Sequence, residues 1–328
     1  MSITSELKNP RSAASLWLDA NFDLDAVAAG LGPQVDGADT IRPEGNLKDY
    51  PWSTVGSAVE FRLRQACGVD YYRTTAAFGN LGRMSNGIFH DALAMLWDNH
   101  QAEEATSRTN AWVLYFAGVC EGIYRSGRGG ELARYGEALS AMERSDAWAR
   151  FGIQMDQLRE GVLKSVDSGR HPCVGQLTEM MAVPEAVLDD IARVSDAAIA
   201  SANFQAIQQS TAFIDDPAFA GGAWVGGADG DFIVGHTLFD VKTTTHPERL
   251  WRDAIRQLVS YVALDADDSH GIEEVAILLP RQRGAVARVG LDEILEHSGF
   301  ESRAEMQASA RRALDPSACG GRNAPSTA

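Results

Sequence analysis

The chain has 328 residues, of which 45% are hydrophobic and 23% are charged, and its formal net charge is −16 at pH 7. This composition is typical of a folded protein and excludes a chain that is disordered along most of its length. The negative charge also excludes a broad basic face that coats duplex DNA, so any contact with nucleic acid has to be local, supported by metal ions or helped by a partner.

The N-terminal residues contain no apolar run long enough for the core of a signal peptide. The longest apolar stretch, Trp112 to Cys120, is too short to span a bilayer. The four cysteines are far apart and form no C-x-x-C pair, which argues against a disulfide framework, a zinc site and an iron–sulfur site. We therefore expect a cytoplasmic protein with reduced cysteines and no association with a membrane.

The first 86 residues are expected to form an N-terminal segment that contains one core helix over residues 53–67. Ser53 or Thr54 can cap this helix, and Gly68 ends it. A candidate strand follows at Tyr71–Thr75. From residue 87 to residue 209, apolar residues recur at three- and four-residue spacing between glycine-rich or polar breaks, which indicates a helical lobe.

The sequence pattern changes at residue 210, where glycines, aromatic residues and β-branched residues become frequent. Phe232–Val234 and Thr237–Phe239 flank Gly235-His236, which is the pattern of a β-hairpin. The elements expected after it are a helix over 247–266, strands over 273–280 and 285–291, a helix over 301–313 and a disordered tail over 314–328. This order predicts an α/β fold, in which residues 210–313 form a small mixed β-sheet flanked by helices and residues 87–209 form a large helical insertion or lobe.

Asp231 and the tripeptide Asp240-Val241-Lys242 lie at the open end of the predicted hairpin. Residues that are symmetric about the turn of an antiparallel hairpin face each other, so the turn brings Asp231 back towards Asp240. Asp240 and Lys242 are two residues apart, so their side chains share one face of the strand. Two carboxylates can hold Mg²⁺ or Mn²⁺, which polarises a phosphodiester and activates water, while Lys242 positions the water or stabilises developing charge.

A D-x-K triplet alone occurs by chance about once in a chain of this size, and a salt bridge at a strand edge would account for it. The wider combination is more specific, because the following helix carries Gln257 and Tyr261 on one face. The stretch GADGDFIVGHTLFDVKTT, residues 227–244, resembles the Asp…(Asp/Glu)-x-Lys core of the PD-(D/E)XK nuclease superfamily. Gln257 and Tyr261 match the Q-x-x-x-Y helix motif of its RecB-like branch.

The resemblance implies a restriction-endonuclease-like core, metal binding by Asp231 and Asp240 with help from the carbonyl of Val241, and catalysis by Lys242. Gln257 and Tyr261 would then orient the catalytic water or contact a substrate phosphate. Asp229 is a rival for the first metal position, since it lies two residues from Asp231 on the same strand face. We favour Asp231 because it directly precedes the apolar strand.

Glu60 has two interpretations. In the stretch Gly56–Glu60 it stands at the histidine position of a Gly-x-x-x-His helix pattern that RecB-like nucleases carry, which makes it a candidate third metal ligand. It can equally form a surface salt bridge with Arg64, four residues further along the helix.

Arg281, Arg283 and Arg288 lie on or near the last strands and can hold the phosphate backbone of DNA locally. The expected function is a metal-dependent deoxyribonuclease of phage biology, anti-phage defence or DNA repair, acting on single- or double-stranded DNA. The alternative is a nucleic-acid-binding or docking subunit of a larger complex without catalysis, because the acidic charge and the helical lobe favour a protein partner or a homo-oligomer. A metal-dependent hydrolase of another phosphoester is a third hypothesis, since the metal chemistry is shared.

Overall fold

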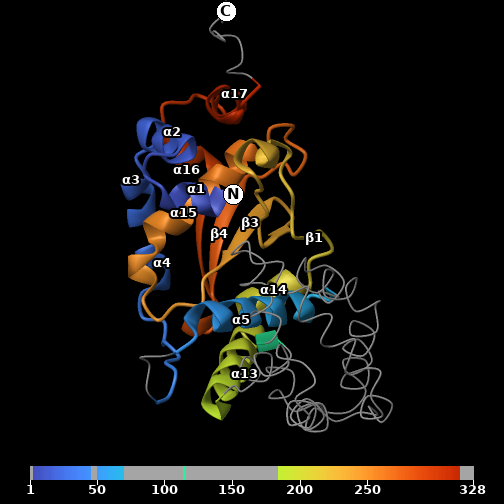
Figure 1. The fold of residues 1–328 in the computed structure, drawn as a ribbon. Helices are drawn as coiled ribbons and strands as arrows, with labels where there is room; N and C mark the ends of the chain where they lie inside the picture. The colour runs from blue at the N-terminus through green and yellow to red at the C-terminus, as the bar shows by residue number, and fades with distance from the viewer. Residues whose placement is uncertain (1–2, 46–49, 70–113, 116–183, 318–328) are drawn as a thin grey trace, which may run out of the picture. The chain divides into compact units, whose positions relative to one another are not determined.

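The computed structural model describes residues 3–45, 50–69, 114–115 and 184–317 (Figure 1). The chain divides into two compact units, one of residues 1–41 with 200–328 and one of residues 42–199. The sequence placed the boundaries at 86/87 and 209/210 instead. The difference arises because apolar side chains of the first 41 residues share a core with the sheet, although they are far from it in the sequence.

The first unit contains one β-sheet and most of the described helices. Its strands are β1 (Phe213–Asp215), β2 (Phe232–Val234), β3 (Thr237–Val241), β4 (Glu274–Leu279) and β5 (Ala285–Gly290). Its α-helices are α1 (Ile3–Lys8), α2 (Ala13–Asn21), α3 (Leu24–Ala29), α4 (Gly32–Val35), α14 (Ala202–Gln208), α15 (Trp251–Leu264), α16 (Leu291–Glu296) and α17 (Arg303–Leu314). Short 3-10 helices are η2 (Ala220–Val225), η3 (Pro247–Arg249) and η4 (Pro280–Gln282). Within the described ranges, no helix is both long and apolar enough to cross a bilayer.

The sheet is mixed and has the strand order β1-β2-β3-β4-β5. Strand β3 runs parallel to β4, while the other neighbouring strands are antiparallel. Helix α15 makes the connection from β3 to β4, since parallel neighbours need a long crossover. The predicted small mixed sheet with flanking helices is therefore confirmed.

The predicted hairpin is also present, as β2 and β3. Phe232 pairs with Phe239 and Val234 pairs with Thr237, and Gly235 makes the turn with a φ of +61°. Strand β1 was not predicted, because it has only three residues and the Asp215-Asp216-Pro217 stretch at its end has the composition of a turn. The structure keeps Asp215 in the strand, and the turn begins at Asp216, whose φ is +49°.

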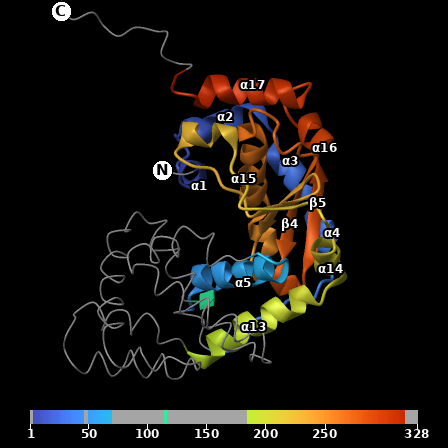
Figure 2. The same cartoon turned by 90° about the vertical axis from the view of Figure 1, so that its right-hand side faces the viewer.

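Helix α15 packs against one face of the sheet, where its apolar side chains meet those of the three central strands. Its buried residues Ile255, Leu258 and Val262 belong to one core cluster with Leu238 and Ile277. Figure 2 shows α15 running alongside β4, with α2 and α17 at one end. The apolar face of the predicted helix 247–266 thus packs on the sheet as α15. The first residues of that range, Pro247–Arg249, form the separate 3-10 helix η3.

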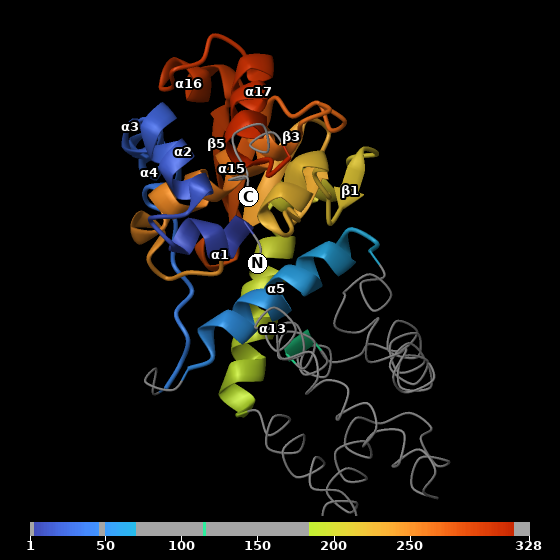
Figure 3. The same ribbon diagram turned by 45° about the horizontal axis from the view of Figure 1, so that its top comes forward.

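The N-terminal helices lie beside α15 on the side away from the sheet strands (Figure 3). Arg256 of α15 is buried and forms an ion pair with Asp19 of α2. Arg252 of α15 lies 2.9 Å from Asp25 of α3. Because a buried guanidinium is costly without an acidic partner, the pair of Arg256 with Asp19 fixes which face of α15 turns towards α2. The half-exposed Arg252 adds a contact with α3.

The opposite face of the sheet carries an aromatic stack. The rings of Phe213 and Phe239 stack on that of Phe232, with centroid distances of 5.3 and 5.0 Å. The edge strand β5 is covered by Gln34. The side-chain oxygen of Gln34 accepts a hydrogen bond of 2.9 Å from the backbone N–H of Arg288, and its amide nitrogen donates one of 2.8 Å to the backbone carbonyl of Arg288. Gln34 therefore occupies groups that could otherwise pair with a strand of another chain.

The second unit contributes two long helices, α5 (Trp52–Ala66) and α13 (Glu185–Ile199), which pack against each other. The core helix predicted at 53–67 is confirmed as α5, and Gly68 follows it with a φ of +85°. The predicted cap is wrong, because the helix starts one residue earlier. Pro51 is the N-cap residue, so Ser53 and Thr54 lie inside the first turn. The strand expected at Tyr71–Thr75 and most of the helical lobe fall outside the described residues.

Replacing Leu258 of α15 by Ala should lower the free energy of unfolding by about 2–5 kcal/mol, because Leu258 is completely buried and the smaller side chain leaves a cavity. Leu16 is 56% exposed and offers the same substitution as a matched control, for which we expect a change within about 0.5 kcal/mol. Denaturant unfolding of both variants measures the difference. Equal losses would show that α15 does not form the core described above.

Candidate functional site

Asp231 and Asp240 come together at the open end of the β2–β3 hairpin. Asp240 is a residue of β3 and is only 2% exposed. Asp231 immediately precedes β2, and its Oδ2 accepts a hydrogen bond of 2.6 Å from the backbone N–H of Val241. The strand register, continued by one pair beyond Phe232 and Phe239, places the two aspartates opposite each other, as the sequence predicted.

Lys242 connects this end of the hairpin to α15. Its Nζ donates hydrogen bonds to Oδ1 of Asp240 at 2.8 Å and to Oε1 of Gln257 at 3.2 Å. Nε2 of Gln257 in turn donates to the phenolic oxygen of Tyr261 at 2.9 Å. The four residues Asp240, Lys242, Gln257 and Tyr261 therefore form one hydrogen-bonded chain, which we call the lysine network.

The protonation behaviour of the site follows from its burial. Burial raises the pKa of Asp240 from 3.8 to about 6, with the ammonium of Lys242 lowering the pKa and the carboxylate of Asp231 raising it. Burial also raises the pKa of Tyr261 far above 10, and the charge of Asp231 adds to this shift. At neutral pH the site thus holds an ionised Asp240 and a neutral phenol.

One oxygen of Asp240 has no hydrogen-bond partner within the described part of the chain. Among the described residues nothing donates to Oδ2 of Asp240, although this atom is buried. An ionised oxygen in that position is costly unless a cation or a donor satisfies it. Carboxylate oxygens are the ligands that Mg²⁺ and Mn²⁺ prefer, so the pair Asp240 and Asp231 fits such an ion.

The described part of the chain holds no group of three or more His, Cys, Asp or Glu side chains arranged for a metal. Two carboxylates are a sparse set for Mg²⁺, which usually keeps several waters and takes few protein ligands. Glu60, the predicted third ligand, makes the alternative contact with Arg64 at 3.1 Å. Glu60 belongs to α5 of the second unit, so its role as a ligand stays a prediction.

Asp229 and Asp231, the two candidates for the first metal position, lie in different environments. Asp229 is exposed, and its backbone forms an isolated bridge with Ala218. Asp231 instead contacts β3 and acts electrostatically on both Asp240 and Tyr261. These contacts favour Asp231 as the first metal position.

The three arginines expected to hold DNA lie in different environments. Arg281 is 0% exposed and donates a hydrogen bond to the carbonyl of Ile41, so it is a core residue and cannot reach a DNA backbone in this structure. Arg283 is exposed and lies 3.9 Å from Asp39. Arg288 is also accessible, although it pairs with Glu274 at 2.5 Å and lies over the ring of Phe239. Arg283 and Arg288 are therefore the accessible members of the three, but Arg288 lies with Phe239 on the face of the sheet opposite α15 and the lysine network.

Two residues that shape the site were missed by the sequence analysis. The ring of Phe219 stacks on that of Tyr261 with centroids 5.2 Å apart. The side chain of Thr4, in α1, lies close enough to the phenol of Tyr261 to lower its pKa slightly, against the larger effect of burial. No motif marks these residues, because they come from segments that only the folded chain brings to α15.

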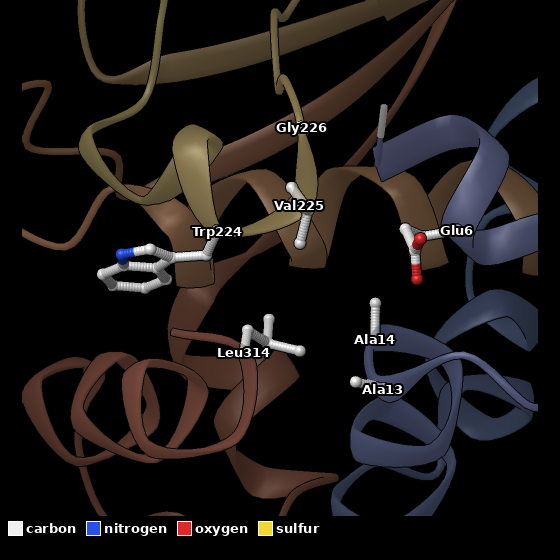
Figure 4. A pocket seen from close by; sticks show the side chains of 7 residues that line it. All are labelled: Glu6, Ala13, Ala14, Trp224, Val225, Gly226 and Leu314. Carbon is white, nitrogen blue, oxygen red and sulfur yellow. The ribbon is translucent and has the colours of Figure 1, made fainter. Parts of the chain in front are cut away.

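A pocket of about 210 Å³ lies elsewhere in the first unit (Figure 4). Its lining comes from Glu6, Ala13, Ala14, Trp224, Val225, Gly226 and Leu314. None of the residues of the lysine network contributes to it. The pocket is therefore not part of the candidate site.

Comparisons of the chain with protein-family models, with curated proteins and with solved structures give no match. The functional assignment thus depends on the chemistry of the residues described above.

Replacing Asp240 by Asn should stabilise the metal-free protein at pH 8, because it removes a buried negative charge. The folded-state pKa of about 6 lies above the unfolded value near 3.8, so the native state of the wild type binds more protons between these values. The cost of the charge is thus fully present above pH 6 and is relieved as the pH falls towards 4. We expect the variant to gain about 1–3 kcal/mol at pH 8, and the gain to shrink below pH 6.

Thermal or denaturant unfolding in EDTA at pH 4, 5, 6 and 8 measures this difference. The exposed Asp229→Asn variant serves as the matched control. A loss of stability at pH 8, or a gain that does not depend on pH, would contradict the buried charge.

Proposed function

We propose that this protein is a divalent-metal-dependent deoxyribonuclease with a PD-(D/E)XK-type site on a restriction-endonuclease-like core. The observation that carries the proposal is Oδ2 of Asp240, a buried carboxylate oxygen that no described residue satisfies. Asp231 lies across the hairpin from it, and Lys242 is bonded to the other oxygen of the same carboxylate. A carboxylate suited to bind metal (Asp240), a second carboxylate (Asp231) and an ammonium (Lys242) thus lie at one end of the hairpin.

Asp231 and Asp240 would hold Mg²⁺ or Mn²⁺, with waters completing the coordination. When bound, such an ion polarises the scissile phosphate and lowers the pKa of water. The protein's part is to fix the two carboxylates, and it does so by different means. Asp231 is held by the backbone N–H of Val241, and Asp240 by Lys242 and by its place within β3.

Lys242 supplies the positive charge that the transition state of phosphodiester cleavage requires. Its side chain is 25% exposed, whereas that of Asp240 is 3% exposed, so the ammonium can reach a phosphate that the buried carboxylate cannot. Gln257 holds the ammonium in place through Oε1. A donor fixed before the substrate arrives stabilises developing charge without reorganising at the moment of reaction.

The net charge of −16 limits how DNA can bind. The exposed guanidinium of Arg283 and the ammonium of Lys242 would provide local positive charge, and the metal would add more. The same acidity is the observation that favours the alternative, a docking subunit without independent catalysis that relies on a partner for nucleic acid.

Cleavage assays with Lys242→Ala, Asp231→Asn and Asp229→Asn test the proposal. We expect Mg²⁺- or Mn²⁺-dependent cleavage of DNA by the wild type, and losses on the order of 100-fold or more for Lys242→Ala and Asp231→Asn. Asp229→Asn is the matched control and should retain most of the activity, since Asp229 is exposed and its backbone pairs with Ala218 instead. The substrates are linear and circular DNA, single- and double-stranded, with EDTA as the metal-free arm.

Wild-type protein that folds and binds metal but leaves every DNA intact would favour the docking subunit. Equal losses for the two aspartate variants would contradict the choice of Asp231 over Asp229.

Metal binding can be measured without cleavage. Mg²⁺ or Mn²⁺ should raise the thermal unfolding midpoint of the wild type, since a ligand at 100 times its Kd stabilises the native state by about 2.7 kcal/mol. Asp240→Asn should lose most of this shift, because it removes the unsatisfied oxygen. Ca²⁺ and a monovalent salt at matched ionic strength are the controls. An equal shift in wild type and variant would place the metal elsewhere.

A further inference from the structure

The chain leaves β3 as a loop that begins at Lys242 and leads to η3. The backbone N–H of Lys242 donates a hydrogen bond of 2.9 Å to the carbonyl of Leu278 in β4, and the N–H of Thr244 donates one of 3.0 Å to the carbonyl of Lys242. The hydroxyl of Thr244 accepts a further bond of 3.0 Å from the backbone N–H of His246. Thr244 therefore bonds to both ends of the loop 242–246.

Gln282 reaches this loop from the turn between β4 and β5. It is the last residue of η4 and is only 3% exposed. Its Nε2 donates a hydrogen bond of 3.1 Å to the backbone carbonyl of Thr244. Because a carbonyl can only accept, this bond fixes which side of the amide faces the loop. A continuous series of hydrogen bonds thus runs from Gln282 through Thr244 to the backbone of Lys242.

The turn that carries Gln282 is itself fixed to the N-terminal segment. The backbone N–H of Ile41 donates to the carbonyl of Arg281 at 2.7 Å, and the guanidinium of Arg281 donates to the carbonyl of Ile41 at 3.2 Å. Nε2 of Gln282 also lies 3.4 Å from the hydroxyl oxygen of Thr40. Because Arg281 and Gln282 are both buried, the turn gives the loop a rigid support.

We infer that Gln282 is a positioning residue of the active site, which holds the backbone of Lys242 through Thr244. The inference rests on the proposed function, since Lys242 is the proposed catalytic lysine. Asp240 and Gln257 hold only the far end of its side chain, Nζ. The four-carbon stem of a lysine is flexible, so the position of the ammonium also depends on where the backbone of Lys242 is held. Gln282 fixes that point from outside the lysine network.

The test is Gln282→Met, because methionine has the length of glutamine but cannot donate to Thr244. We expect kcat for DNA cleavage to fall about tenfold, since a small displacement of a catalytic group slows the reaction. KM should stay the same, because Gln282 is buried and does not meet the substrate. Gln34→Met is the matched control, since Gln34 also donates to a backbone carbonyl, that of Arg288, and should keep the wild-type kcat.

Both methionine variants are expected to fold. In Gln282→Met the carbonyl of Thr244 loses a donor. The substitution also removes Oε1, a buried acceptor for which the described residues provide no donor. These effects oppose each other, so the midpoint of thermal unfolding should change little. Gln282→Leu removes the same donor with a side chain of different shape, so the test stands if one of the two variants fails to fold.

A second readout needs no activity. The chain has four lysines, at positions 8, 48, 164 and 242, and acylation of each by an amine-reactive reagent can be followed by mass spectrometry. In the wild type, Lys242 should react more slowly than the exposed Lys8, because its ammonium is largely covered and bonded twice. The rate at Lys242 relative to Lys8 should rise severalfold in Gln282→Met and stay unchanged in Gln34→Met. A merely structural role of Gln282 would shift the unfolding midpoint and leave this ratio unchanged.

The two proposals fail in different ways. A wild type that cleaves no DNA would overturn the proposed function, while faster acylation of Lys242 in Gln282→Met would still support the hold of Gln282 on Lys242. Unchanged kcat together with an unchanged acylation rate of Lys242 in folded Gln282→Met would overturn the role of Gln282. The role is overturned as well if Gln34→Met lowers kcat as much as Gln282→Met, since the loss would then not be specific to the loop.

Discussion

The ion pair between Asp240 and Lys242 is the interaction on which the candidate site depends. It places an almost fully buried carboxylate at the end of β3, where burial raises the pKa of Asp240 and the residues that the structure describes bond only one of its two oxygens. Such an arrangement costs stability unless another cation joins it. Buried ionisable groups with shifted pKa values are typical of functional sites, and Asp240 is such a group beside a second carboxylate.

Helix α15 joins this chemistry to the core of the unit. On one side it is held by ion pairs with the N-terminal helices, one from the buried Arg256 and one from the half-exposed Arg252. On another it presents Gln257 to Lys242 and, one helical turn further on, Tyr261 to Gln257. Because the same helix is also the crossover between β3 and β4, the strand that carries Asp240 and the helix that carries Gln257 are fixed to each other by a continuous core. Side chains on such rigid elements keep their geometry better than side chains on loops.

The acidic composition remains compatible with a site for DNA because electrostatics near the site are local. Interactions between exposed charges fade beyond about 10 Å at 0.1 M salt, so distant acidic residues affect a bound phosphate less than the ammonium of Lys242 at the site itself. Arg281 was expected to contact a phosphate, but it is buried in the core. An arginine at a strand end is a phosphate contact or a buried partner of backbone carbonyls, and only its surroundings decide which.

The sequence by itself determined the local elements of the site. A glycine turn between two apolar strands sets the hairpin register, which brings Asp231 opposite Asp240, and the spacing of Gln257 and Tyr261 sets their common helix face. Tertiary structure alone decided what depends on contacts between distant segments. The first 41 residues join the sheet, Thr4 and Phe219 surround Tyr261, Arg281 turns inward and β1 extends the sheet. Spacing along the chain records periodicity and turns, whereas burial and partners at a distance follow from packing, which no local pattern encodes.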